Sequence, residues 1–163
     1  MLGGTRSGKS EYAEGLVKAL PGPVTYMATA VVGDDPDFAM RVEVHRRRRP
    51  QSWATAEVGA DLVAELGRTE GTALVDSLGT WVACSWFEGA GFAADSDGLC
   101  RALQERRGHT VLVSEEVGLG VHPATEAGRQ FADALGEVNR AVAAVAGEAV
   151  LVVAGRVLRL DEA

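Results

Sequence analysis

The sequence predicts an α/β fold with a mostly parallel sheet, and three observations support this prediction. Short apolar runs typical of buried strands recur along the chain, at 24–28, 72–76, 110–114 and 149–153. Segments with helical patterning separate them, at 10–20, 37–49, 58–67, 77–87, 97–107 and 124–146. A glycine-rich loop stands directly before the first of these helices. Because strands that alternate with helices form parallel sheets, we expect one domain over residues 1–163.

The last predicted helix, 124–146, has the clearest pattern. Five apolar residues recur there at helical spacing: Phe131, Leu135, Val138, Val142 and Val145. Gly147 is placed to end this helix.

Residues 157–160 follow Gly155 after a very short turn, so we expect them to return as an antiparallel strand at the sheet edge. The stretch 88–97, rich in Gly, Ala and Asp, is expected to be a flexible loop.

The composition is that of an ordinary soluble protein, with 47% hydrophobic and 24% charged residues. No apolar run approaches the ~20 residues that cross a membrane, and the start does not have the pattern of a secretory signal. The two cysteines, Cys84 and Cys100, match neither a disulfide framework nor a metal cluster, so we expect a cytoplasmic protein. A net charge of −7 argues against nucleic acid as the main partner.

The segment Gly3-Gly4-Thr5-Arg6-Ser7-Gly8-Lys9-Ser10 matches the phosphate-loop (Walker A) pattern G-x-x-x-x-G-K-[ST]. Its glycines allow a tight backbone whose N–H groups converge on phosphate oxygens, and the following helix adds its dipole. Lys9 is predicted to reach the β- and γ-phosphates, and the Ser10 hydroxyl to hold Mg²⁺. The loop therefore predicts a nucleoside triphosphate site used for phosphoryl or nucleotidyl transfer. Only Met1 and Leu2 precede it, so we expect a truncated first strand, exposed neighbouring strand edges and a loosened loop.

Two further features favour a nucleotide site. Asp76 ends an apolar strand, where it is either a Walker B ligand of Mg²⁺ or a turn residue, and the phosphate loop favours the metal role. His45 precedes a block of four arginines, 46–49, at the end of a predicted helix that Pro50 stops. Guanidinium groups discourage protonation of an imidazole, and a neutral imidazole is a nucleophile toward phosphorus. The residues alone leave this role and that of a surface histidine in a basic helix equally open. His109 and His122 are expected to be structural or loop residues.

Together, several segments resemble the bifunctional adenosylcobinamide kinase / adenosylcobinamide-phosphate guanylyltransferase family of cobalamin biosynthesis. They run in the family's order over almost the whole chain, at 3–10, 26–30, 41–50, 53–57, 74–78, 113–120, 129–133, 136–139 and 152–155. The most specific part is His45-Arg46, followed by Arg49-Pro50 and by Trp53-x-Thr55-x-Glu57.

The resemblance implies a P-loop NTPase fold, a RecA-like three-layer sandwich, that forms homotrimers. It implies that a nucleoside triphosphate, ATP or GTP, phosphorylates adenosylcobinamide, and that GTP then donates GMP to the new phosphate, giving adenosylcobinamide-GDP. His45 would carry the GMP as a phosphoramidate, and Lys9 would also be catalytic. The implied nucleotide-binding residues are Gly3, Gly4, Thr5, Arg6, Ser7, Gly8, Lys9, Ser10, Thr29, Ala30, Val31, Arg46, Arg47, Arg48, Arg49, Glu57 and Asp76, with Ser10 and Asp76 also holding Mg²⁺.

One departure concerns the segment 114–118, which reads Ser-Glu-Glu-Val-Gly where relatives usually have Ser-Asn-Glu-Val-Gly. The extra carboxylate, Glu115, would repel phosphate unless it points away or meets Mg²⁺. Two alternatives stand beside the bifunctional enzyme: a P-loop small-molecule kinase without guanylyl transfer, and a nucleotide-binding protein without catalysis.

Overall fold

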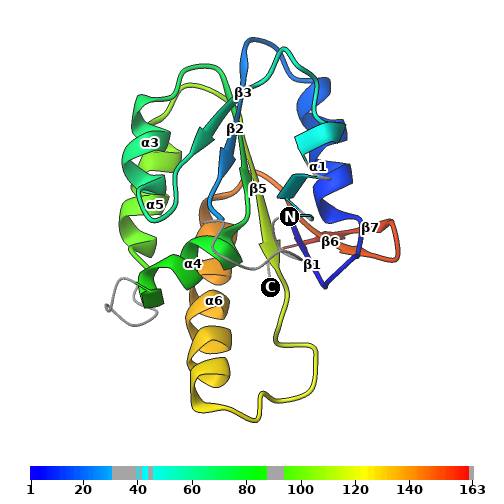
Figure 1. Cartoon of the computed structure of the whole chain (residues 1–163), viewed down its shortest axis with the longest axis vertical. Coiled ribbons are helices and arrows are strands. Elements are labelled where there is room, and N and C mark those ends of the chain that lie inside the picture. Colours follow the sequence, from blue (N-terminus) through cyan, green and yellow to red (C-terminus); the bar gives the residue numbers. More distant parts are fainter. Residues whose placement is uncertain (31–39, 41, 44–45, 88–93, 162–163) are drawn as a thin grey trace.

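The computed structural model of the chain describes residues 1–30, 40, 42–43, 46–87 and 94–161. The described strands form a seven-stranded sheet in the order β3-β2-β4-β5-β1-β6-β7 (Figure 1). The strands are β1 (Leu2–Gly3), β2 (Val24–Ala28), β3 (Ala54–Glu57), β4 (Thr72–Asp76), β5 (Thr110–Glu115), β6 (Ala149–Val153) and β7 (Arg156–Leu160). All neighbouring strands are parallel except β6 and β7, which form an antiparallel pair. The mostly parallel sheet and the antiparallel C-terminal strand are therefore confirmed.

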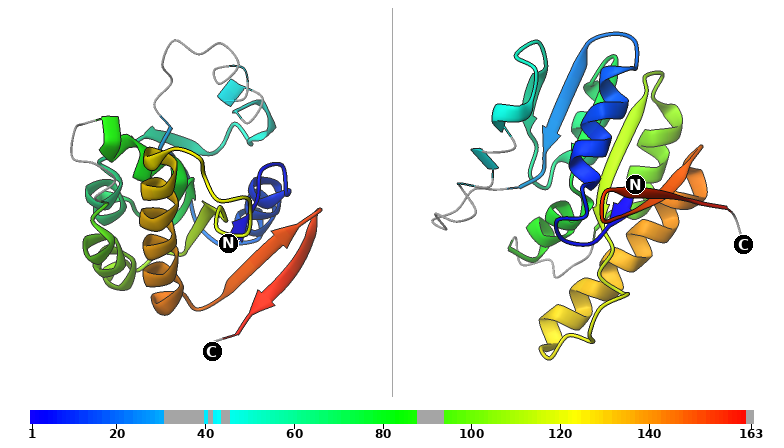
Figure 2. Two further views of the ribbon diagram at one scale, coloured as in Figure 1. Left: turned by 90° about the horizontal axis from the view of Figure 1, so that it is seen from below. Right: turned by 90° about the vertical axis from the view of Figure 1, so that its right-hand side faces the viewer.

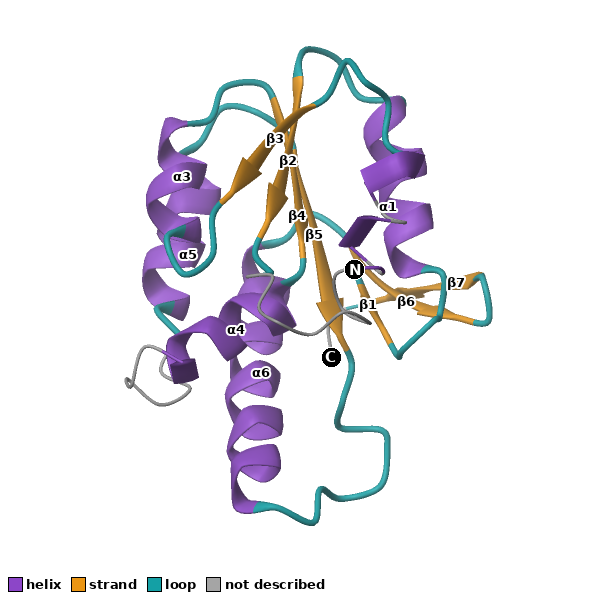
Figure 3. Ribbon diagram, viewed as in Figure 1, coloured by secondary structure: helices purple, strands orange, loops and turns teal. Residues whose placement is uncertain are grey.

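Helices cover both faces of this sheet, so the domain has three layers (Figures 2 and 3). The helices are α1 (Lys9–Lys18), α3 (Leu62–Arg68), α4 (Leu78–Phe87), α5 (Ser96–Glu105) and α6 (Glu126–Val145). Side chains alternate along β4: Leu74 packs with Val17 of α1, whereas Val75 packs in the larger cluster with Leu99 and Leu135 of α5 and α6. This alternation explains why β4 is a continuous apolar run, because both of its faces are buried. The expected α/β fold class is confirmed.

The edge strand β3, which lies next to β2, was not predicted from the sequence. Ala54–Glu57 is short and has no buried apolar run. Among the described residues it pairs only with β2, from Thr25 opposite Ala54 to Ala28 opposite Glu57. The helix expected over 58–67 begins only at Leu62. Its predicted start was wrong because the Val58 amide still donates to the Ala28 carbonyl at 2.9 Å, and a turn at Gly59, with φ of 48°, precedes the helix.

Six of the thirteen residues of the helix predicted over 37–49 lie outside the described residues. The described part, 40, 42–43 and 46–48, is helical. Residues 88–93 of the expected flexible loop also lie outside the described residues, and α5 begins at Ser96. Within the described part of the chain, every helix is too short or too polar to cross a membrane.

The short strand β1 lies between β5 and β6 in the middle of the sheet. Leu2 pairs with Ser114 on one side and Leu151 on the other. The glycine-rich loop therefore leaves the sheet at its centre, at the carboxyl ends of the parallel strands, which is where α/β proteins bind ligands.

Candidate functional site

A cavity of about 560 Å³ opens at the carboxyl ends of β2, β4 and β5. It is lined by the glycine-rich loop, by the ends of these strands, by the beginning of α4 and by two of the arginines that precede Pro50. The lining residues are Thr5, Arg6, Ser7, Gly8, Lys9, Ser10, Glu11, Tyr26, Ala28, Ala30, Val42, Arg48, Arg49, Glu57, Asp76, Ser77, Thr80 and Glu115. The cavity thus brings together segments that are far apart in the sequence.

The glycine-rich loop has the backbone that its sequence predicts. Gly8 caps the N-terminus of α1 with a φ of 93°, a left-handed conformation that glycine adopts without strain. A Cβ atom on Gly3 would lie 2.5 Å from the Ser7 hydroxyl oxygen, so a side chain there would displace the loop. The turn between β6 and β7 supports the loop from outside, because the Gly155 amide donates to the Ser7 carbonyl at 2.9 Å. The loop therefore presents the first turn of α1 to the cavity.

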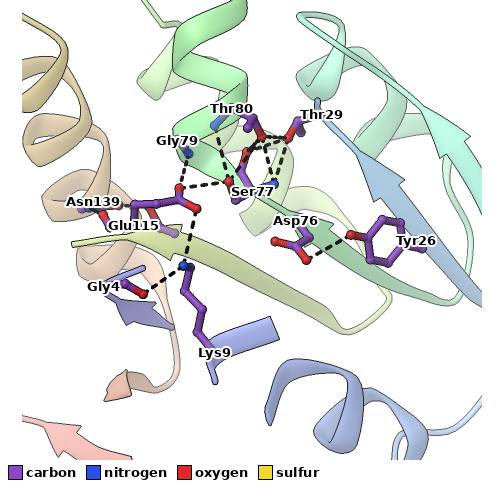
Figure 4. A network of polar contacts seen from close by, with 11 residues as sticks. Gly4, Lys9, Tyr26, Thr29, Asp76, Ser77, Gly79, Thr80, Glu115 and Asn139 are labelled. Carbon is purple, nitrogen blue, oxygen red and sulfur yellow. Dashed lines mark hydrogen bonds and ion pairs between the residues drawn. The ribbon is translucent and has the colours of Figure 1, made fainter. Parts of the chain in front are cut away.

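Lys9 lines the cavity, is only 9% exposed and points toward Gly4 and Glu115 (Figure 4). Its ammonium nitrogen Nζ donates to the Gly4 carbonyl at 3.3 Å and lies 3.6 Å from Oε1 of Glu115. The second carboxylate oxygen of Glu115, Oε2, accepts from the Ser77 hydroxyl at 2.9 Å and from the Gly79 amide at 3.1 Å. The carboxylate that the sequence singled out therefore points into the cavity and not away from it.

Asp76 ends β4 and lines the same cavity. It lies between the Lys9–Glu115 pair and Tyr26 (Figure 4). The Tyr26 hydroxyl donates to Oδ2 of Asp76 at 3.0 Å, and the guanidinium carbon of Arg49 lies 3.5 Å from the centre of the Tyr26 ring. Tyr26 is 4% exposed. Burial raises the pKa of Tyr26 and the Asp76 carboxylate raises it further, whereas Arg49 acts in the opposite direction. Tyr26 thus stays a neutral donor that orients Asp76 and supports Arg49.

This arrangement predicts an alkaline loss of stability that depends on Tyr26. An unfolded tyrosine ionises near pH 10, about where free tyrosine does, whereas folded Tyr26 keeps its proton to higher pH. Its contribution is therefore complete below about pH 10 and is lost as the pH rises above it, because only the unfolded chain releases the proton. Urea unfolding at pH 8, 10 and 11 should show this loss in wild type and in Tyr12→Phe. The loss should be smaller in Tyr26→Phe, and an identical pH dependence in all three proteins would contradict the assignment.

A buried group of hydroxyls fixes the start of α4 beside the cavity. The Thr29 hydroxyl donates to the Ser77 carbonyl at 2.7 Å, accepts from the Ser77 amide at 2.9 Å and contacts the Thr80 hydroxyl. Thr29 is fully buried, so its side chain holds Ser77 in place and does not line the cavity, whereas the next residue, Ala30, does. Val31 lies outside the described residues.

The arginine block divides between the cavity and the surface. Arg48 donates to Oε1 of Glu14 at 3.3 Å, and the Glu14 side chain is only 5% exposed. Arg48 and Arg49 line the cavity, and Arg48 is also partly open to solvent, with its side chain 39% exposed. Arg46 and Arg47 are exposed and do not line the cavity, and Arg47 donates a hydrogen bond to Glu43 at 2.9 Å. The buried carboxylate on α1 thus ties the block to the helix that follows the glycine-rich loop.

The cavity includes most of the residues that the sequence selected, from Thr5 to Ser10 together with Ala30, Arg48, Arg49, Glu57 and Asp76. Gly3 and Gly4 belong to the loop but do not line the cavity. His45 lies outside the described residues. Sequence reasoning missed Tyr26, Ser77 and Thr80 as site residues. Their position was readable in part, because Tyr26 is two residues before the end of a predicted strand and Ser77 directly follows Asp76. The binding roles of all these residues stay predictions.

Comparison with known proteins finds relatives of almost the whole chain. Residues 1–160 match the family described as cobinamide kinase / cobinamide phosphate guanyltransferase (CobU). The bifunctional adenosylcobalamin biosynthesis protein CobP of Pseudomonas aeruginosa is 37% identical over 163 residues, which cover 95% of this chain and 92% of the relative. The bifunctional adenosylcobalamin biosynthesis proteins CobU of Escherichia coli and Salmonella typhimurium are 35% and 36% identical over 174 and 173 residues, covering 95% of this chain and 94% of each relative.

Proposed function

The chain belongs to the cobinamide kinase / cobinamide phosphate guanyltransferase family, and we propose that it catalyses two successive reactions on one corrinoid. In the first, a hydroxyl of adenosylcobinamide attacks the γ-phosphate of ATP or GTP, forming an O–P bond and releasing the nucleoside diphosphate. In the second, GMP passes from GTP to that phosphate, which gives adenosylcobinamide-GDP and releases pyrophosphate. The observation that carries the proposal is one cavity that joins the glycine-rich loop, Asp76 and two arginines of the His45 segment.

The described residues suit each reaction. The N-terminus of α1, the loop amides and Lys9 would bind the β- and γ-phosphates, where charge develops during phosphoryl transfer. Arg48 and Arg49 line the other part of the cavity, and guanidinium groups bind phosphate oxygens in a bidentate manner. His45 precedes them by three and four residues in the chain. We propose that its imidazole attacks the α-phosphate of GTP, forms a P–N bond, releases pyrophosphate and later passes the GMP to the corrinoid phosphate.

We propose Mg²⁺ as the resident ion. The Ser10 hydroxyl and the Asp76 carboxylate are hard oxygen ligands that line the same cavity, and the Tyr26 hydroxyl holds one Asp76 oxygen in place. Mg²⁺ is commonly held by one or two protein oxygens together with phosphates, so this donor set fits it. When bound, the ion would neutralise part of the charge on the phosphates.

Incubation with GTP labelled at the α-phosphate tests the proposal. With Mg²⁺ present, the protein should retain an acid-labile, alkali-stable label, and added adenosylcobinamide phosphate should remove it. GTP labelled at the γ-phosphate is the control and should leave no label on the protein. Phosphorylation of adenosylcobinamide without any α-label would instead favour a kinase without guanylyl transfer. Nucleotide binding without either reaction would favour a non-catalytic binding protein.

We also propose a cytoplasmic homotrimer. Apolar side chains on β7 at the edge of the sheet support an assembly, because Val157, Leu158 and Leu160 are 40%, 60% and 39% exposed. Sedimentation equilibrium measures the number of subunits directly, and a monomer across the tested concentrations would overturn the trimer.

A further inference from the structure

Glu115 occupies a position between the two halves of the site. It ends β5, and β5 lies between β1, which leads into the glycine-rich loop, and β4, which ends in Asp76. Its carboxylate therefore lies where the phosphates and their cation would meet, 3.6 Å from the Lys9 ammonium (Figure 4).

Hydrogen bonds fix both the carboxylate and the backbone of Glu115. Oε2 accepts hydrogen bonds from the Ser77 hydroxyl and the Gly79 amide at 2.9 and 3.1 Å. Its backbone is held as well, because the Asn139 amide nitrogen donates to the Glu115 carbonyl at 3.1 Å. A Cβ atom on Gly79 would overlap with Oε2, so the start of α4 fits closely around the carboxylate. These contacts would keep the negative charge in place when a nucleotide enters.

The charges around the cavity are balanced among the residues that the structure describes. Four acidic and four basic side chains line it: Glu11, Glu57, Asp76 and Glu115 against Arg6, Lys9, Arg48 and Arg49. A nucleoside triphosphate brings several more negative charges. At its γ-phosphate end it must share Lys9 with Glu115, so the two anions compete for one ammonium group. A divalent cation is attracted by both and would remove this conflict.

We propose that Glu115 makes nucleotide binding depend on a divalent cation, so that the site takes the metal–nucleotide complex and rejects the free nucleotide. This inference rests on the proposed function, because it assumes that the cavity binds a nucleoside triphosphate. Glu115 acts here as a specificity-determining residue through its charge. Its hydrogen bonds with Ser77 and Gly79 keep that charge beside the phosphate end.

The test compares Glu115→Gln with Glu116→Gln. The first variant keeps the size of the side chain and one oxygen that can accept from Ser77 and Gly79. It removes the charge and replaces the other oxygen with an NH₂ group. The second removes a charge from the next residue, whose side chain accepts from the Gly118 amide at 2.7 Å and does not line the cavity. Dissociation constants are measured by equilibrium dialysis with MgCl₂ and with EDTA, in the absence of adenosylcobinamide. The probe is the α,β-methylene analogue of GTP, because His45 cannot displace its β- and γ-phosphates.

For each protein we compare the dissociation constant in EDTA with that in MgCl₂. This ratio should be at least ~10 times larger for wild type and for Glu116→Gln than for Glu115→Gln. The difference should come from tighter metal-free binding by Glu115→Gln. Equal metal dependence in wild type and Glu115→Gln would overturn this inference while leaving the proposed function intact. No binding to wild type under either condition would overturn the proposed function and this inference together. A circular dichroism spectrum and melting temperature like those of wild type establish that Glu115→Gln is folded.

Discussion

Replacing His45 by alanine is expected to abolish transfer of GMP while leaving phosphorylation of adenosylcobinamide largely intact. Alanine has no nitrogen that can form the P–N bond, so the covalent route is lost and the transfer rate should fall by at least about a thousandfold. Phosphorylation uses the opposite end of the nucleotide. The groups that would serve it, Lys9 and Asp76, belong to the α1 and β4 parts of the cavity and are unchanged by the substitution.

The two activities must be measured separately for this comparison. Transfer is followed with GTP and adenosylcobinamide phosphate, and phosphorylation with adenosylcobinamide and GTP labelled at the γ-phosphate. His122→Ala is the matched control, because this histidine is exposed and does not line the cavity. The control should keep both activities. If His45→Ala instead loses both to the same extent, the histidine only shapes the nucleotide pocket and the covalent role is wrong.

The fold was largely predictable because its signals are local. Buried parallel strands such as β4 and β5 are apolar on both faces, and this pattern stands out in the sequence. The glycine-rich loop was equally readable, since Gly8 takes a left-handed conformation at a helix start. The edge strand β3 was missed because Ala54–Glu57 is held by hydrogen bonds to one neighbour, and such pairing leaves little trace in the side chains.

Most residues that line the cavity could be predicted from the sequence, whereas the contacts among them could not. The sequence pairs Lys9 with phosphate, whereas the structure shows that Glu115 already contacts this lysine. That contact depends on where β5 lies in the sheet and on the close approach of Gly79, both of which are long-range features. The role of Tyr26 was hidden for the same reason. A tyrosine in a buried strand looks like a core residue until β2 and β4 are paired and its hydroxyl meets Asp76.

Replacing Lys9 by alanine is expected to weaken binding of the Mg²⁺–GTP analogue about a hundredfold or more, since it removes a charge-assisted contact in a largely buried place. The loss should exceed that of the lysine contact alone. Without the ammonium group, Glu115 stays beside the phosphate end of the nucleotide. Its negative charge is then no longer offset by Lys9 and repels the phosphates. Lys18→Ala, at the exposed far end of α1, is the control and should bind as wild type does.

A double variant separates the two parts of this effect. If repulsion from Glu115 contributes, Lys9→Ala combined with Glu115→Gln should recover part of the lost affinity, so that the two substitutions are not additive. The four dissociation constants of this cycle are measured by equilibrium dialysis under one buffer condition. An unchanged constant for Lys9→Ala would remove the phosphate loop from the proposed function. Strict additivity would mean that Lys9 and Glu115 act on the nucleotide independently, although their charged atoms lie 3.6 Å apart.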